Sequence, residues 1–175
     1  NNKNLPLMIT GNQNLKPINY YEERGSAQCK SSVIFGGMLT NGTTIIKAKK
    51  SRNHTELLCK YLKLPIKINK SKNYDFIKIR KIKKIKALNY LIPSDISSAA
   101  FFIVLTALSK NSKLEIKNIN INPTRIGIIK ILKKMGVSII LKNKKKYKGE
   151  LIADIFIQSS ENLKAINCPS NLNSG

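Results

Sequence analysis

The sequence predicts an α+β fold built from two copies of one unit, in which a helix, a strand, a helix and two strands follow one another. Two observations predict it. Apolar residues recur with a helical period in four segments and alternate with polar residues in the segments between them. Similar residues also recur 71 positions apart, as in the pairs Ser26 and Ser97, Leu57 and Ile128, Leu58 and Ile129, Tyr61 and Leu132, Ile66 and Val137, and Ile68 and Ile139. This offset exceeds the roughly 20–50 residues of solenoid repeats, so we expect two similar layers of helices on sheets.

In the first half, Gly11 separates two short alternating segments, and Ser26 is a preferred N-cap residue in front of the first helix. Asn41 and Gly42 mark a turn after that helix, and Pro65 ends the second helix because it cannot continue one. The expected elements are strands at 5–10 and 16–21, a helix at 26–40, a strand at 43–48, a helix at 54–64, and strands at 66–68 and 76–82.

The second half follows the same order. Ser94 or Asp95 can cap its first helix, and Gly136 can close its second. The expected elements are a helix at 96–108, a strand at 113–119, a helix at 124–135, and strands at 137–142 and 151–157. Pro93 disfavours helix in the residue before it, which places the joint between the units around residues 91–95.

The composition of the 175 residues excludes several classes of protein. Hydrophobic residues make up 42%, which is too many for a disordered basic tail. The longest apolar run, at 99–108, is well short of the roughly 20 residues that span a bilayer, and no secretion signal opens the chain. The three cysteines have no CxxC spacing, which is typical of reduced thiols in a cytosol-like compartment.

The net charge of +23 raises nucleic acid as a partner, because lysine and arginine neutralise phosphates. The details weaken this interpretation. Lysine accounts for 28 of the 32 basic residues, whereas arginine, which makes bidentate phosphate and base contacts, accounts for four. Isoleucine and asparagine are abundant as well, and AT-rich codons specify all three residue types. A solvated lysine surface is therefore the better interpretation.

Four polar motifs stand at predicted helix starts, namely 25–32, 51–56, 93–102 and 122–127. Helix starts attract anions, and arginines there add charge-assisted hydrogen bonds. The same residues also have a plain interpretation as N-caps, close-packing small residues and solvated arginines, which the residues alone favour at 25–32 and 93–102. The single histidine, His54, has no second ligand nearby, so neither a metal site nor a catalytic triad is predicted.

In this order and spacing, the motifs resemble those of the EPSP synthase family, the 3-phosphoshikimate 1-carboxyvinyltransferases. They read SAQ-x-KS, SR-x-HTE, P-x-DISSAAFF, and NPTR-x-G followed by L-x-x-MG, and the later stretch GELIAD at 149–154 is also similar to a family segment. The resemblance covers essentially the whole chain.

The resemblance implies the enolpyruvyl transferase fold, an inside-out α/β barrel in which each of two domains holds three βαβαββ units. By this analogy residues 1–91 end the N-terminal domain, with a complete unit at about 26–82. Residues 92–175 begin the C-terminal domain, with a unit at about 95–159 and a hinge near Pro93. The implied protein is a cytoplasmic transferase of aromatic amino acid biosynthesis, monomeric at full length, with no cofactor, metal, membrane or nucleic-acid partner.

The resemblance also implies the reaction, in which the enolpyruvyl group of phosphoenolpyruvate moves to the 5-hydroxyl of shikimate 3-phosphate. Ser26, Ala27, Gln28 and Arg52 are expected to bind shikimate 3-phosphate, and Gln28 also phosphoenolpyruvate. Ser51, Lys30 and Arg125 are weaker candidates. The acid and base residues of the family fall outside the chain, so no catalytic residue is expected within it and the chain alone is expected to be inactive. A basic nucleic-acid-binding module and a non-catalytic relative of the same fold are the alternatives.

Overall fold

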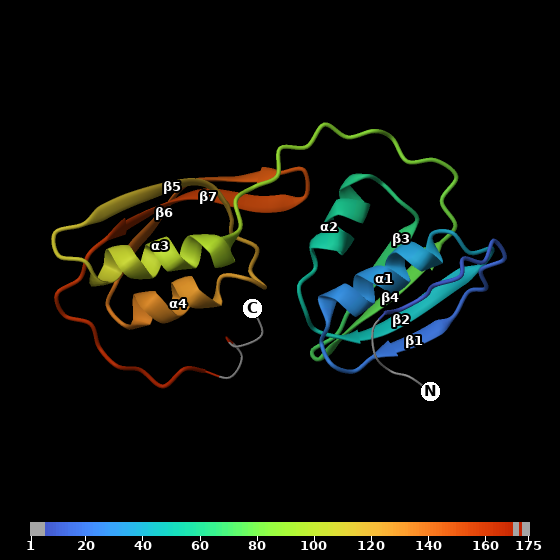
Figure 1. The fold of residues 1–175 in the computed structure, drawn as a ribbon, viewed down its shortest axis with the longest axis horizontal. Coiled ribbons are helices and arrows are strands. Elements are labelled where there is room, and N and C mark those ends of the chain that lie inside the picture. The colour runs from blue at the N-terminus through green and yellow to red at the C-terminus, as the bar shows by residue number, and fades with distance from the viewer. Residues whose placement is uncertain (1–5, 170–171, 173–175) are drawn as a thin grey trace.

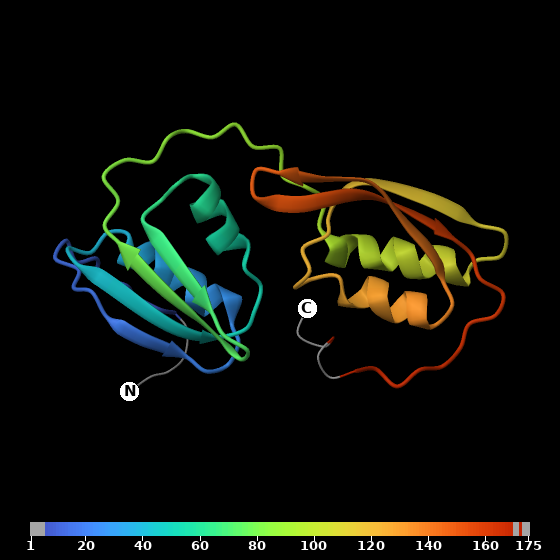
Figure 2. The ribbon, with the colours of Figure 1, turned by 180° about the vertical axis from the view of Figure 1, so that it is seen from behind.

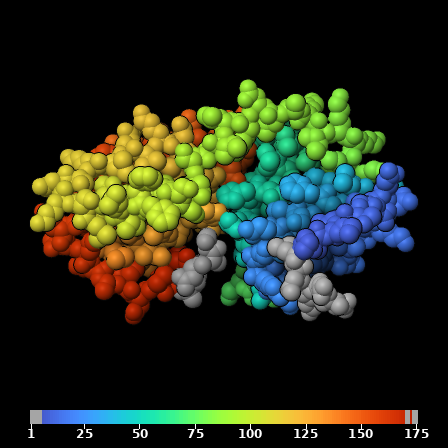
Figure 3. Space-filling model, in the orientation of Figure 1, coloured from blue at the N-terminus to red at the C-terminus, as the bar shows by residue number. Residues whose placement is uncertain are grey.

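A computed structural model describes residues 6–169 and residue 172. Two units lie side by side, each with its two helices packed on one face of a sheet (Figures 1 and 2). The space-filling view shows the boundary between the units near the middle of the molecule (Figure 3). The α+β fold predicted from the sequence is confirmed.

The first unit holds a four-stranded sheet in the order β1-β2-β4-β3, in which only β1 and β2 are parallel. Its elements are β1 (Asn19–Glu22), α1 (Ala27–Gly37), β2 (Thr43–Lys49), α2 (His54–Tyr61), β3 (Ile66–Lys70) and β4 (Tyr74–Arg80). Alternate residues of β2 face the helices, so Ile46 and Ala48 are buried there together with Ile34 of α1 and Cys59 of α2. The alternation that predicted these strands therefore builds the first core.

The second unit holds an antiparallel sheet in the order β5-β7-β6. Its elements are α3 (Ile96–Leu108), β5 (Lys113–Asn120), α4 (Gly127–Lys134), β6 (Ser138–Tyr147) and β7 (Glu150–Gln158). The centre of its core is formed by Ile103, Ile119 and Ile155, none of which is exposed. Ser94 forms an isolated parallel bridge with Ile119, at the place where Glu22 of β1 pairs with Ala48 in the first unit. The second unit therefore has a single bridge where the first unit has the strand β1.

The helix ends follow the expected chemistry. Ser26 caps α1, since its hydroxyl accepts from the backbone N of Cys29 at 3.2 Å. Of the two candidates in front of α3, Asp95 supplies the cap, and its carboxylate accepts from the backbone N of Ser97 at 3.2 Å. Gly136 adopts a φ of +97° directly after α4, a conformation that favours glycine.

The strand expected at 5–10 is wrong. Residues 6–10 form no strand and are exposed, and Leu5 lies outside the described residues. Alternation predicts a strand only where a partner strand and a core are available, and Leu7, Met8 and Ile9 contact neither core. The helix expected from 124 begins only at Gly127, because the side-chain oxygen of Asn122 accepts from both the backbone N and the hydroxyl of Thr124 and so stabilises a turn.

The hairpin of the second unit is much longer than that of the first. Ile68 pairs with Ile77, whereas its repeat counterpart Ile139 pairs with Ile157, so twice as much chain separates the second pair. A register shift after Lys142 marks where β6 leaves the pattern of β3. The extra residues carry the tip of the β6–β7 hairpin across to the first unit, beside α2 (Figures 1 and 2).

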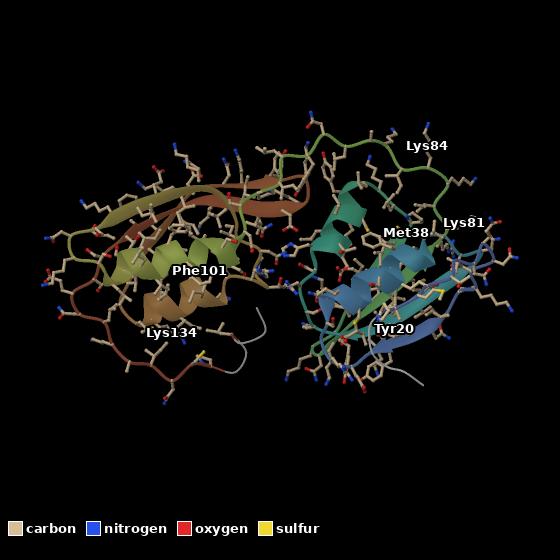
Figure 4. The ribbon with its side chains drawn as sticks, viewed as in Figure 1. Tyr20, Met38, Lys81, Lys84, Phe101 and Lys134 are labelled. Carbon is tan, nitrogen blue, oxygen red and sulfur yellow. The ribbon has the colours of Figure 1, made fainter. Side chains whose placement is uncertain are left out.

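An extended segment, residues 81–95, connects the units along one edge of the molecule (Figure 1). Lysines on it, such as Lys84, project into solvent, as does Lys134 of α4 (Figure 4). Among the described residues, helix length and apolarity nowhere reach what crossing a bilayer requires. The outer face of α3 is apolar instead of charged, with Phe101, Phe102, Leu105 and Leu108 all exposed.

Replacing Ile103 by alanine is expected to lower the free energy of unfolding of the second unit by about 2–5 kcal/mol, because the side chain is fully buried and its removal leaves a cavity. The matched control is Phe101→Ala, two residues away on the same helix and 80% exposed, for which the change should be much smaller. Urea unfolding followed by circular dichroism measures both. Equal losses of unfolding free energy in the two variants would contradict the placement of Ile103 in the core and of Phe101 at the surface.

Candidate functional site

A pocket of about 220 Å³ lies where α1 and α2 begin. Both helices begin on the side of the first unit that faces the second (Figure 1). Residues from two helix starts thus line one cavity, and because the first N–H groups of a helix have no partner within it, such an arrangement suits an anion. The residues that line it are Ala27, Gln28, Ser31, Arg52, His54 and Thr55. The structure therefore brings Ala27, Gln28 and Arg52 together, and Ser26 adjoins them as the cap of α1.

The turn before α1 is anchored by a carboxylate that sequence reasoning missed. Glu22, 2% exposed at the end of β1, accepts hydrogen bonds from the backbone N of Arg24 at 3.0 Å and of Gly25 at 2.7 Å. Gly25 has a φ of +75°, which favours glycine. This anchor fixes the position of Ser26, while the first turn of α1 carries no acidic residue that would already occupy its positive end.

The loop before α2 supplies the cationic side of the pocket. The Nη2 atom of Arg52 donates to the side-chain oxygen of Gln28 at 3.3 Å, which links the two helix starts. The hydroxyl of Ser51 is buried and has no hydrogen-bond partner among the described residues. Among the described residues, no carboxylate lines the pocket. Its hydroxyls, on Ser31 and Thr55, hydrogen-bond each other at 2.7 Å, while the amide of Gln28 and the guanidinium of Arg52 keep N–H donors for an anion.

Lys30 is not placed to contact a ligand in the pocket. Its ammonium group is not exposed at all, forms an ion pair with Glu56 of α2 at 2.7 Å, and donates to the backbone oxygen of Arg52 at 2.9 Å. Lys30 therefore ties α1 to α2 and to the loop that carries Arg52. It does not line the pocket.

Arg125 lies just before α4 in the second unit, and its guanidinium group is already paired. Its Nη2 atom donates to the carboxylate of Asp95 at 3.0 Å and to the hydroxyl of Ser97, and its side chain is 12% exposed. Asp95 thus places a negative charge at the cap of α3, whereas the cap of α1 is the neutral Ser26. The second unit therefore repeats the local fold around the pocket, but its arginine is paired with a carboxylate and is not available to an anion.

A cluster of side chains from both units adjoins the pocket. The Nδ1 atom of His54 lies 2.6 Å from Oε1 of Glu150, at the tip of the long hairpin. The Nδ2 atom of Asn122, 1% exposed, donates to Asn53 at 2.8 Å and to the other oxygen of Glu150 at 3.3 Å. Burial alone would raise the pKa of Glu150, but hydrogen bonds from His54, Asn120 and Asn122 and the charge of His54 outweigh it and lower that pKa.

Sequence reasoning missed the roles of Asn53, Asn122 and Glu150. Asn53 occupies the N-cap position of α2, but its side chain makes no cap hydrogen bond, and its oxygen accepts from Asn122 in the other unit. The stretch at 149–154 was noted as similar to a family segment, but no local signal indicates its partner 96 residues away.

A larger cavity of about 710 Å³ lies between the units, under the connecting segment. Apolar side chains dominate it, including Phe35, Leu58, Leu62, Ile85 and Ile92. Its cations Arg125 and Lys148 are engaged by Asp95 and by the backbone oxygen of Asn89. The smaller pocket is therefore the better site for a phosphorylated ligand. Within the described residues, no group of three or more histidine, cysteine and acidic side chains could hold a metal ion.

Comparisons with known proteins agree with the resemblance. The family model for EPSP synthase (3-phosphoshikimate 1-carboxyvinyltransferase) matches residues 1–169. The 3-phosphoshikimate 1-carboxyvinyltransferase of Endomicrobium trichonymphae is 38% identical over 169 residues, which cover 96% of this chain and 38% of that protein. The same enzyme of Ruthia magnifica subsp. Calyptogena magnifica is 43% identical over 173 residues, covering 98% and 39%.

A solved structure of EPSP synthase from Acinetobacter baumannii matches the fold with a TM-score of 0.79 and 37% identity, covering 94% of this chain and 37% of that chain. The chain thus spans less than two-fifths of the length of these relatives.

Replacing Lys30 by methionine is expected to lower the free energy of unfolding by about 3–5 kcal/mol, because it leaves the Glu56 carboxylate buried without its counterion. Chemical unfolding measures the loss. The control is the double variant Lys30→Met with Glu56→Met, which removes both charges and should recover most of the stability. A double variant as unstable as the single one would contradict the ion pair as the cause.

Proposed function

Because this chain belongs to the EPSP synthase family, we propose that it forms the shikimate 3-phosphate-binding part of an enolpyruvyl transferase. In the proposed reaction, the enolpyruvyl group of phosphoenolpyruvate is added to the 5-hydroxyl of shikimate 3-phosphate, and phosphate then leaves. The products are 5-enolpyruvylshikimate 3-phosphate and inorganic phosphate. This places the whole protein in aromatic amino acid biosynthesis.

The observation that carries the proposal is the pocket formed by two helix starts with no carboxylate in its wall. A phosphate dianion needs several N–H and O–H donors, and charge-assisted hydrogen bonds to it are the strong ones. In our proposal the hydroxyl of Ser26, the backbone N of Ala27 and the guanidinium of Arg52 bind the phosphate of shikimate 3-phosphate. The hydroxyl of Ser51 is buried without a hydrogen-bond partner among the described residues, but Ser51 does not line the pocket, so we assign it no phosphate contact.

Gln28 is proposed to lie between the two substrates. Its side-chain oxygen accepts from Arg52, so its amide NH₂ group remains to donate to phosphoenolpyruvate. We assign no substrate contact to Lys30 or Arg125, since the first is buried in its ion pair with Glu56 and the second is paired with Asp95.

The organisation of the whole protein is also part of the proposal. Residues 1–91 would end an N-terminal domain and residues 92–175 begin a C-terminal one, with the hinge near Pro93. The separate cores of the two units and the extended segment 81–95 between them support this division. We further propose, from the family resemblance, a monomer that acts in the cytoplasm and needs no cofactor.

Titration of the chain with shikimate 3-phosphate is expected to shift the NMR signals of Ser26, Gln28 and Arg52. Replacing Arg52 by alanine should weaken binding by roughly tenfold or more, because a hydrogen bond to a charged group is worth about 1.5–3 kcal/mol. The control is Arg80→Ala, which removes the same charge from an exposed position on β4. Equal losses in the two variants would indicate binding by net charge alone.

Incubation of this 175-residue chain with both substrates is expected to release no phosphate above background. The pocket holds donors for binding, but addition to phosphoenolpyruvate also needs an acid and a base, and no carboxylate of the described residues lines the pocket. A colorimetric phosphate assay measures the turnover. Sustained, enzyme-dependent phosphate release would contradict this expectation.

A further inference from the structure

The loop that carries Arg52 is held from both units. On one side Lys30 donates to the backbone oxygen of Arg52 at 2.9 Å, within the first unit. On the other side, the next two residues contact the second unit, Asn53 through Asn122 at 2.8 Å and His54 through Glu150 at 2.6 Å. His54 also lines the pocket beside Arg52, so this second contact reaches the wall of the site itself.

The tip of the β6–β7 hairpin packs closely against α2 of the first unit and against the connecting segment. Gly149, with a φ of +96°, lies so close to α2 that a Cβ atom there would stand 2.9 Å from the backbone oxygen of Leu57. The hydroxyl of Tyr147 accepts from the backbone N of Leu91 at 3.2 Å, and its ring packs on that of Tyr90 with centroids 5.5 Å apart. Glu150 itself is 6% exposed.

We propose that Glu150 is a positioning residue for the anion pocket, acting from the second unit through His54. The inference rests on the proposed function, which makes the pocket a phosphate site. Seating of the hairpin tip and anion binding are then coupled, so each stabilises the other by the same free energy. The repeat explains why only this pocket has such a residue, because the hairpin of the first unit is too short to have a counterpart of Glu150.

The direction in which anion affinity changes when the Glu150 side chain is removed distinguishes a positioning role from an electrostatic effect through space. A carboxylate near an anion site repels the anion, so its removal should tighten anion binding if charge acts through space alone. If Glu150 acts by holding His54 and the Arg52 loop, removal of its side chain should weaken binding despite the loss of a negative charge. The two readings therefore predict opposite changes.

The test measures the dissociation constant of shikimate 3-phosphate for the whole chain and for three variants. Glu150→Ala is expected to weaken binding about fivefold or more. Glu150→Gln keeps an oxygen that can accept from His54 and should restore most of the affinity. Glu115→Ala removes a carboxylate from an exposed position on β5. The dissociation constant of this variant should change only as far as the loss of one negative charge from the surface changes it. Tighter binding in both Glu150 variants would overturn the proposal.

Amide hydrogen exchange tests the same inference without a ligand. The backbone N of Leu57 donates to the backbone oxygen of Asn53 at 3.0 Å in the first turn of α2, so its exchange reports on the held end of the helix. Exchange there should accelerate in Glu150→Ala but not in Glu115→Ala, while α3 stays protected as evidence that the second unit is folded. If the unmodified chain binds no shikimate 3-phosphate, the proposed function fails. Unchanged exchange at Leu57 overturns the positioning role in either case.

Discussion

A buried ion pair between Lys30 and Glu56 fixes the geometry on which the candidate site depends. A fully buried ammonium group is tolerated only with a close counterion and hydrogen-bond acceptors, and here these come from a neighbouring helix and from the backbone of Arg52. The pair therefore allows α1 and α2 few relative positions. It also explains why the two helix starts open on one pocket, since the same lysine holds both the helix and the loop.

The two units share one fold but differ in how their helix starts are neutralised. At α3 the chain supplies its own anion, Asp95, and Arg125 pairs with it. At α1 the cap is a serine, Arg52 donates to the neutral amide of Gln28, and the hydroxyl of Ser51 has no partner among the described residues. The same local architecture thus yields a closed structural contact in one unit and an open binding pocket in the other. The residues that cap the two helices differ accordingly, with Ser26 at α1 and Asp95 at α3.

Local signals in the sequence predicted most elements of the fold, and they failed where distant contacts decide. The caps Ser26 and Asp95 and the turn at Gly136 depend on adjacent backbone atoms, so sequence indicates them directly. The strand expected at 5–10 was wrong because alternation carries no information about whether a partner strand is present. Within the site, the motifs indicated Gln28 and Arg52. Asn53 and Glu150 escaped prediction because their partners lie in the other unit.

The long hairpin has a consequence for the order of events during folding. Paired strand residues within a unit lie at most 45 positions apart, whereas the contact between His54 and Glu150 closes a loop of 96 residues. Loop-closure entropy opposes such a contact until both ends are already ordered. We therefore expect each unit to assemble before the two units dock. On this expectation, the contact of Glu150 with His54 forms last, and the pocket reaches its native geometry after the rest of the first unit.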